Sequence, residues 1–293
     1  MSIKDNALIV TLSVGKPQMT KTDERGTSAA ERANNAHNAG NYRKNLYPQQ
    51  LVKPLRAVES AARSYIESVT YPWSRGEYLL PTTRFIEFAD RIDKYKLEYD
   101  MSATAFLNNW ANVMYHAQQQ QGDMFDGSAY PDVSELKRRF KFVVNYKPVT
   151  DMSDFRVSLQ DEELDKLSRT VEANTKQAME DMMRAPLERL REVVGRLNET
   201  MLKPEREVLN SRKRVVEVKP PIFRDSVVDN IMHEITLLQD FADILPAEVT
   251  NVATMATAVV HNPDMLRNSA ELRQQTHVDT SALLGEIDAL LED

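Results

Sequence analysis

Residues 164–201 decide the fold of this chain, and they read LDKLSRTVEANTKQAMEDMMRAPLERLREVVGRLNETM. Apolar residues return in this stretch at alternating steps of three and four, and charged residues fill the positions between them. This spacing is typical of a helix that packs against other helices. The first series of such positions is Leu164, Leu167, Val171, Asn174 and Ala178. Asn174 is its polar member, and a single polar residue in such a seam is a candidate for setting the register of two helices.

A second series continues the pattern after a change of phase near Pro186. Its positions are Leu187, Leu190, Val194, Leu197 and Met201. Proline inside a helix removes one backbone hydrogen bond and clashes with the preceding turn, so we expect Pro186 to kink the helix or to start a second one. The stretch therefore predicts a kinked pair of helices, either buried in an intramolecular bundle or paired between copies of the chain.

The composition favours a helical globular protein. At 293 residues and 42% hydrophobic content, the chain is long enough for one elongated domain or two smaller ones. The absence of cysteine excludes disulfides, thiolate metal sites and cysteine nucleophiles, and the low glycine content argues against turn-rich β folds and glycine-lined nucleotide sites. Residues 1–16 lack the pattern of a secretory signal and no stretch approaches the length of a membrane span, so we expect a cytoplasmic protein.

Charge is divided unevenly along the chain. Residues 1–150 carry 20 Lys and Arg against 16 Asp and Glu, whereas residues 151–293 carry 17 against 28, and the whole chain has a net charge of −7. A mildly basic half is weak support for nucleic-acid binding, because dedicated binders show a much stronger clustered excess of cations. The acidic half would repel a phosphate backbone.

The N-terminal half reads as a mixture of strand and helix. Ala7–Val14 is rich in β-branched residues and predicts a strand, and Phe140–Tyr146 predicts a second strand that pairs with it. Residues 16–45 are polar and nearly free of large apolar side chains, which predicts a long loop or a flexible arm. Apolar residues at helical spacing predict helices at residues 48–70, 85–95 and 106–114.

The C-terminal half reads as helical nearly throughout, with Pro246 and Pro263 opening helices and a last helix at residues 280–291. The sequence thus predicts a mainly α fold, an elongated helical bundle with long, kinked, coiled-coil-like helices and a small β-hairpin or two-stranded sheet. Residues 1–150 are expected to form a mildly basic α+β part with the N-terminal strand and the flexible arm. Residues 151–293 are expected to form an acidic, all-helical part that ends in an acidic helix.

No arrangement of residues in the sequence amounts to a catalytic signature. Ser13–Lys16 follows a strand like the end of a phosphate-binding loop, but it lacks the earlier glycine, and Pro17 stands where a hydroxyl should bind magnesium. Asp225, Asp229 and His233 are spaced to share one helix face and hold a metal, yet acidic residues on a solvated face are far commoner. We therefore predict no enzyme activity, no cofactor and no metal site.

A basic stretch offers a candidate surface for nucleic acid. Its residues are Lys137, Arg138, Arg139, Phe140 and Lys141. Cations interleaved with an aromatic ring suit the binding of phosphates together with the stacking of bases, and cations of the 16–45 arm would add phosphate contacts. The alternative is a helix or strand whose apolar side faces the core while its charges face water.

The acidic C-terminus offers a candidate surface for a protein partner. The residues that share one helical face there are Leu283, Leu284, Ile287, Leu290 and Leu291. An acidic amphipathic helix suits a hydrophobic groove with a basic rim on a partner. The alternative is a terminal helix folded onto its own domain, because an apolar stripe of this kind must be buried somewhere.

Several segments carry a likeness to a known family. They are the strand Ala7–Val14, the turn Leu79–Pro81 leading into Phe85 and Phe88, the run Phe140–Val144 before Pro148 and Phe155, and the long charged helices that follow. In these segments the chain resembles an uncharacterised family of bacteriophage and bacterial proteins, often encoded beside a MoxR-type AAA+ ATPase and a von Willebrand factor A protein. The resemblance covers most of the chain and contains no functional motif. It implies an adaptor or substrate-side component of an ATPase remodelling machine.

Three functions are therefore expected, in this order. The first is a non-enzymatic, phage-type helical interaction or adaptor protein that assembles with itself or with an AAA+ ATPase, in the host cytoplasm if a phage encodes it. The second is a nucleic-acid-associated protein of phage replication, recombination or host takeover. The third is a structural component of the virion, to which no particular residue points.

Overall fold

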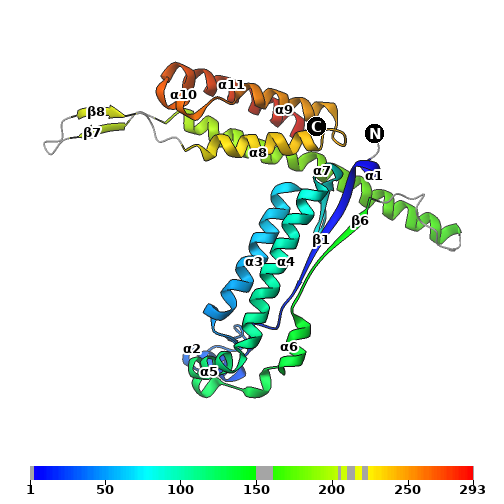
Figure 1. Ribbon diagram of the computed structural model, residues 1–293, viewed down its shortest axis with the longest axis vertical. Helices are drawn as coiled ribbons and strands as arrows, with labels where there is room; N and C mark the ends of the chain where they lie inside the picture. The colour runs from blue at the N-terminus through cyan, green and yellow to red at the C-terminus, as the bar shows by residue number, and fades with distance from the viewer. Residues whose placement is uncertain (1–2, 150–160, 204–205, 210–214, 220–223, 293) are drawn as a thin grey trace. The chain divides into compact units, whose positions relative to one another are not determined.

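The computed structural model describes residues 3–149, 161–203, 206–209, 215–219 and 224–292 (Figure 1). This part of the chain is mostly helical, as predicted. The helices are α1 (Ile3–Asn6), α2 (Glu24–Asn34), α3 (Gln49–Val69), α4 (Phe85–Asn108), α5 (Trp110–Gln121), α6 (Val133–Arg139), α7 (Asp161–Met201), α8 (Ser226–Asp240), α9 (Ala247–Val259), α10 (Pro263–Asn268) and α11 (Ala270–Glu292). The strands are β1 (Ala7–Gly15), β2 (Thr20–Thr22), β3 (Arg43–Asn45), β4 (Tyr71–Ser74), β5 (Glu77–Pro81), β6 (Lys141–Pro148), β7 (Arg206–Leu209) and β8 (Val215–Lys219).

The main sheet has four strands in the order β4-β5-β1-β6, and β2-β3 and β7-β8 form two-stranded sheets. The predicted pairing of the N-terminal strand with the strand that follows Arg139 is confirmed, because β1 and β6 are neighbours. The predicted two-stranded sheet is too small, since the β4-β5 hairpin extends it. Pro72 lies in β4 beside a shift of register, where a missing N–H is tolerated, and Gly76 takes a φ of 77° in the turn.

The chain divides into two compact units, and the division does not follow a single boundary at residue 150. Unit 1 comprises residues 1–9, 69–84 and 147–293, and unit 2 comprises residues 10–68 and 85–146. Unit 2 therefore occupies two insertions in the sequence of unit 1. The two N-terminal segments belong to unit 1 because their apolar residues share its core, among them Ala7, Tyr71 and Leu79.

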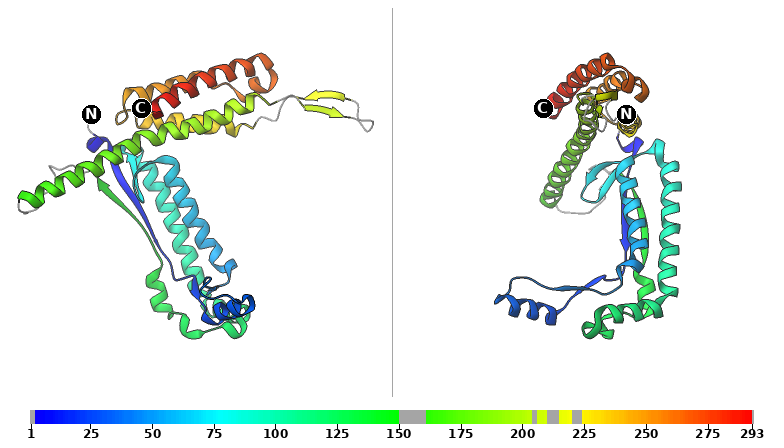
Figure 2. Two further views of the ribbon diagram at one scale, coloured as in Figure 1. Left: turned by 180° about the vertical axis from the view of Figure 1, so that it is seen from behind. Right: turned by 90° about the vertical axis from the view of Figure 1, so that its left-hand side faces the viewer.

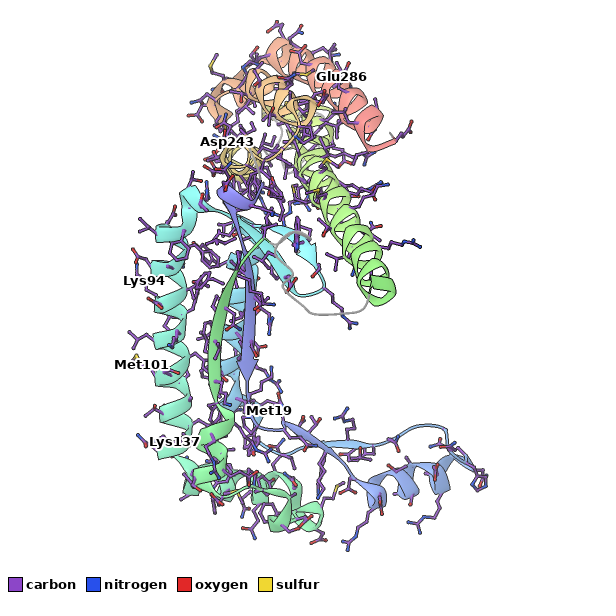
Figure 3. All side chains as sticks on the ribbon, turned by 90° about the vertical axis from the view of Figure 1, so that its right-hand side faces the viewer. Met19, Lys94, Met101, Lys137, Asp243 and Glu286 are labelled. Carbon is purple, nitrogen blue, oxygen red and sulfur yellow. The ribbon has the colours of Figure 1, made fainter. Side chains whose placement is uncertain are left out.

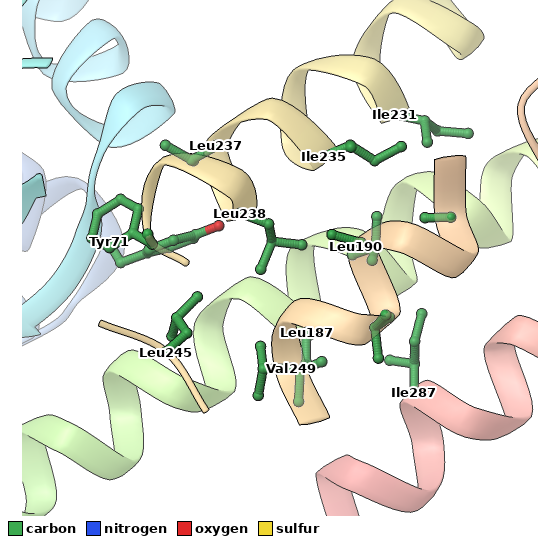
Figure 4. Packing of buried hydrophobic residues seen from close by; sticks show 14 of the residues in the cluster. Tyr71, Leu187, Leu190, Ile231, Ile235, Leu237, Leu238, Leu245, Val249 and Ile287 are labelled. Carbon is green, nitrogen blue, oxygen red and sulfur yellow. The ribbon is translucent and has the colours of Figure 1, made fainter. Parts of the chain in front are cut away.

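The core of unit 1 lies between helices α7, α8, α9 and α11 (Figure 4). Residues of the second apolar series provide the contribution of α7, and none of Leu187, Leu190, Val194 and Leu197 is more than 3% exposed. Ile235 of α8 and Ile287 of α11 are buried in the same cluster. This series is therefore the buried face of an intramolecular bundle. Of the first series, Ala178 is buried and Asn174 is exposed, and the side chains of Leu164 and Leu167 lie outside the described residues.

Helix α7 runs without interruption through Pro186 (Figure 2). The prediction that this proline divides the stretch into two helices is wrong. Pro186 removes the hydrogen bond that its N–H would give to the carbonyl of Met182, but it is itself buried, and Met182 and Leu187 on either side are each 3% exposed. Burial of the flanking apolar residues outweighs the loss of one backbone hydrogen bond.

Polar contacts fix α11 along α7. The side-chain nitrogen of Asn198 donates to the carbonyl of His277 at 3.0 Å and to the hydroxyl of Thr280 at 2.8 Å. Arg191 pairs with Asp288, with one of its two contacts at 3.3 Å. Because these bonds lie along the same pair of helices as the apolar contacts, they define which face of α11 is buried.

Unit 2 is built on the long helices α3 and α4, which lie side by side (Figure 1). Tyr65 of α3 stacks on Phe88 of α4, with ring centroids 5.8 Å apart. Phe106, near the end of α4, meets Tyr47 edge-on at 5.5 Å. The apolar face of α4 that the sequence predicts is therefore confirmed as its inner face, and aromatic pairs of this geometry add to the burial of their area.

Residues 16–45 contain β2, α2 and β3, so the prediction of a flexible arm is wrong. The carboxylate of Asp23 accepts from the backbone N–H of Gly26 at 2.8 Å and caps α2. The same carboxylate pairs with Lys44 of β3 at 3.1 Å, and the two side chains are no more than 10% exposed. Lys44 also donates to the carbonyl of Met124. A helix cap and a buried ion pair stabilise this segment. Polar contacts of this kind cannot be recognised from the spacing of apolar residues.

Strands β7 and β8 contradict the prediction of an all-helical C-terminal part. They pair antiparallel from Arg206 opposite Lys219 to Leu209 opposite Val215. Valine recurs in both strands, and β-branched residues favour extended backbone over helix. The local preference for strand therefore prevails over the helical character of the surrounding sequence.

Candidate functional site

The five apolar residues of the acidic C-terminus lie in α11 and face their own bundle. Leu283 and Ile287 are 1% and 0% exposed, and Leu284, Leu290 and Leu291 are partly buried against the same core. Of the two readings of this segment, the terminal helix folded onto its own domain describes the structure. A partner could bind this face only after α11 had left α7.

The basic stretch is divided between the last turn of α6 and the start of β6. Lys137, Arg138 and Lys141 are exposed, and Arg139 is exposed and pairs with Glu135 one turn earlier. The aromatic ring at the centre of the stretch faces inward. Phe140 packs on Tyr99 and Phe106, with centroids 6.5 Å and 5.7 Å apart. Phe140 is partly buried in these contacts, so stacking of a base on its ring and phosphate contact by the cations both stay predictions.

The weak likeness to a phosphate-binding loop has a packing explanation. Gly15 lies so close to β6 that a Cβ atom there would stand 2.7 Å from the carbonyl oxygen of Arg139. Its own carbonyl accepts a hydrogen bond from Tyr99 at 2.7 Å. Lys16 pairs with Glu59 of α3 at 2.6 Å. These residues join β1 to its neighbours within unit 2.

The helical Asp and His series lies at the start of α8. Asp225, Asp229 and His233 are exposed, and Asp225 pairs with Arg267 of α10. No group of three or more His, Asp and Glu side chains in the described part of the chain is arranged to hold a metal ion. The series therefore contributes an ion pair between α8 and α10 on the surface of unit 1.

A polar cavity of about 320 Å³ lies in unit 2 beside Tyr47 and Tyr130. The hydroxyl of Tyr47 is buried and has no hydrogen-bond partner among the described residues, and burial raises its pKa to about 12. The carboxylates at the rim are already engaged: Asp132 caps α6 and Glu135 pairs with Arg139. Among the described residues that line this cavity, the buried group without a partner is thus the neutral phenol of Tyr47, which is a weak acid, base or nucleophile near neutral pH.

Two buried oxygen atoms without described partners lie in the core of unit 1. They are the hydroxyl of Tyr71 and Oε2 of Glu234 on α8. Burial raises the pKa of Glu234, an effect that Arg189 and His233 oppose. The guanidinium of Arg189 lies 5.1 Å from the centroid of the Tyr71 ring. This cluster lies beneath the apolar packing of α7 and α8. We therefore expect it to affect the stability of unit 1 and not to contact a ligand.

The outer face of α4, here defined as Ile86, Leu97 and Met101, presents large apolar side chains to solvent. They are 77%, 61% and 63% exposed, which places them among the most exposed large apolar residues of the described chain. Steps of eleven and four residues place all three on one side of a helix. Figure 3 shows Met101, with Lys94, on the side of α4 that turns away from β1 and β6. Helix α4 is therefore apolar on two opposite faces.

Helix α3 provides an internal comparison. Its solvent side carries small and polar residues such as Lys53, Ser60 and Glu67, and no large apolar residue on it is exposed. Single exposed apolar residues are ordinary on protein surfaces, but a line of three along one helix beside a helix with none is a property of that face.

Exposed charged residues lie within and around the outer face of α4. Asp90 stands in line with Ile86 and Leu97, and the flanking residues are Asp93, Lys94, Lys96, Glu98 and Asp100. None of these six has an ion-pair partner among the residues that the structure describes. The spacing of Ile86, Leu97 and Met101 is present in the sequence, but the aromatic series of the inner face gives a stronger helical pattern over the same residues.

Among the described residues, no helix has both the length and the apolar character required to cross a bilayer. Comparison of the chain with protein families, with curated proteins and with solved structures finds no match.

Proposed function

We propose that the protein is a non-enzymatic helical interaction protein, and that it binds through the outer face of α4. The observation that carries this proposal is the exposure of Ile86, Leu97 and Met101 along one line of a helix whose opposite face is core. Burying a Leu, Ile or Met side chain contributes about 1.5–3 kcal/mol, so this face supplies several kcal/mol to a complex. A face of this kind binds another helix or an apolar groove.

The partner that we propose, apart from another copy of the chain, is an AAA+ ATPase of the MoxR class. This choice rests on the resemblance to the phage and bacterial family alone. The placement of the C-terminal leucines in the core of unit 1 moves the proposed contact to α4. The charged residues around Leu97 then act as the polar rim of the contact, which governs orientation and association rate more than affinity.

Site-specific photo-cross-linking tests the proposal. A photoreactive residue replaces Leu97 in one version of the full chain and Ser60, on the solvent side of α3, in the other, and both are produced in the cells that make the protein. We expect one discrete adduct from position 97 and none from position 60. Equal adducts from both positions, or none from position 97, would contradict the proposal.

The adduct identifies the partner, whose affinity for the purified chain is then measured. Leu97→Glu places a charge in the proposed contact and should weaken binding at least tenfold, whereas Ser60→Glu should leave it unchanged. For an ATPase partner, the rate of ATP hydrolysis with the wild-type chain and with Leu97→Glu shows whether the contact serves its activity.

Nucleic-acid binding is a second proposal, which the exposure of Lys137, Arg138 and Lys141 on one short segment favours. With Phe140 packed on Tyr99 and Phe106, the cations would provide most of such binding, which would depend steeply on salt. A mobility shift at low salt that disappears in a variant with all three cations replaced by glutamine would support it. The absence of any shift at low salt would end it.

A further inference from the structure

We infer that the outer face of α4 binds the same face of a second copy of the chain, with the two helices antiparallel and crossing at Leu97. This inference rests on the proposed function of that face and adds the identity and orientation of its partner. The order of apolar and charged residues along α4 supports this pairing.

The apolar residues are placed for a two-fold contact. When α4 is turned by a two-fold axis that passes beside Leu97, this residue meets Leu97 of the second copy. Met101 lies one turn further along the same side, so it extends the apolar centre in both directions from the axis and lies level with Asp93 of the second copy. Each of the two is more than 60% exposed in a single chain, and both would be covered in the pair.

Two charge pairs around this point are complementary across the axis, whereas Asp90 and Asp93 add acidic residues to the same face. Lys94 and Glu98 lie on one flank of the face, and Lys96 and Asp100 lie on the other. In an antiparallel pair, residues of one flank meet residues of the same flank on the second helix. Lys94 therefore meets Glu98 of the second copy, and Lys96 meets Asp100 of the second copy, each twice by symmetry.

The same arrangement explains how acidic residues are tolerated at this contact. Asp93 is exposed and approaches Asp100 of the second copy on one flank, where Lys96 of each chain provides the opposite charge. Exposed ion pairs are individually weak, so the apolar centre provides the affinity and the charges fix the antiparallel orientation. A partner of unrelated sequence would need to reproduce this alternation, which a second copy has by construction.

Sedimentation equilibrium of the full chain and of charge variants tests the inference. The wild-type chain should show a monomer–dimer equilibrium at micromolar concentration. Lys94→Glu sets two acids against each other on both sides of the axis, and it should weaken the dimer roughly tenfold. The double variant Lys94→Glu/Glu98→Lys exchanges the two charges and should restore the wild-type dissociation constant.

Lys53→Glu, on the solvent side of α3, is the matched control for a charge reversal and should leave the dimer unchanged. All of these residues are exposed, and circular dichroism checks that each variant is folded. A wild-type chain that remains monomeric at every concentration overturns the inference, and so does a double variant as weak as the single one. A monomer that still gives a discrete adduct with a different protein from position 97 overturns the inference and leaves the proposed function standing.

Discussion

Charged and polar side chains hold several parts of this protein in place from the inside. Lys44 and Asp23 form an ion pair of low exposure, and Asn198 bridges two helices. Glu234 differs from these, because one of its oxygens is buried without a described partner. Burial disfavours the charged form of this carboxylate more than the nearby Arg189 and His233 favour it, so the pKa of Glu234 is raised.

Glu234→Gln should remove a pH dependence from unfolding. A folded-state pKa above the unfolded value contributes stability that is complete in acid and is lost as the pH rises through the folded pKa. The wild type should therefore lose stability relative to Glu234→Gln between acidic and neutral pH, while the two converge in acid. Urea unfolding at a series of pH values measures this, with the exposed Glu286→Gln as control. Parallel curves for wild type and Glu234→Gln would show that folding leaves the pKa of Glu234 unchanged, and would contradict the prediction.

Two glycines should respond to alanine with opposite signs. At Gly15 a Cβ would meet the carbonyl oxygen of Arg139 at 2.7 Å, so Gly15→Ala should cost about 1–3 kcal/mol of unfolding free energy. At Gly195, inside α7, nothing lies within 4 Å of the added carbon. Gly195→Ala should stabilise the protein by about 0.5–1 kcal/mol, because alanine is the better helix former. Chemical denaturation compares the two, and a stabilising Gly15→Ala would contradict the close approach of β1 and β6.

At the scale of elements, α7 and α11 show what one stretch of sequence predicts. Apolar steps of three and four predicted the buried side of α7, because that side is decided by local periodicity. The continuity of α7 through Pro186 was not predicted, since it depends on helices that pack on it from distant parts of the chain. The ordered structure of residues 16–45 was not predicted for the same reason. It depends on the contact of Lys44 with Asp23, which are separated in sequence by a helix and a turn.

Removing the contact between α11 and α7 should destabilise unit 1. Ile287 is fully buried, so Ile287→Ala should cost about 2–5 kcal/mol, whereas the exposed Glu286→Ala should change unfolding by less than about 0.5 kcal/mol. Thermal unfolding followed by circular dichroism makes the comparison. If Ile287→Ala melted with the wild type while losing a protein partner, α11 would be a docking helix after all.

At the scale of the whole molecule, the fold class could be predicted from the sequence, whereas the division of the chain into two units could not. Low glycine content and long amphipathic stretches predicted a mainly α protein, and the pairing of β1 with β6 followed from two β-branched segments. The partition of the chain depends on Tyr71 and Leu79, whose place in the core of unit 1 involves helices more than a hundred residues away. The outer face of α4 was not predicted, because the aromatic residues of the opposite face dominate the apolar pattern of the same helix.

The interleaved units should acquire structure in a fixed order. Unit 2 is complete at residue 146, and its long helices form contacts that are close in sequence, which fold early. Arg84 of unit 1 pairs with Asp240, 156 residues later. Pulsed hydrogen exchange during refolding should therefore protect amides of α3 and α4 before those of β4 and β5. Simultaneous protection of all four elements would contradict this order.

The same interleaving has a consequence during synthesis on the ribosome. The hairpin of β4 and β5 leaves the exit tunnel early, with Tyr71 and Leu79 ready for burial, but the helices that cover them are translated last. For much of its elongation the nascent chain therefore carries an uncovered aromatic and aliphatic segment between two parts of a finished unit. Such a chain is a natural client for a co-translational chaperone, and premature termination near residue 150 would release a product prone to aggregate.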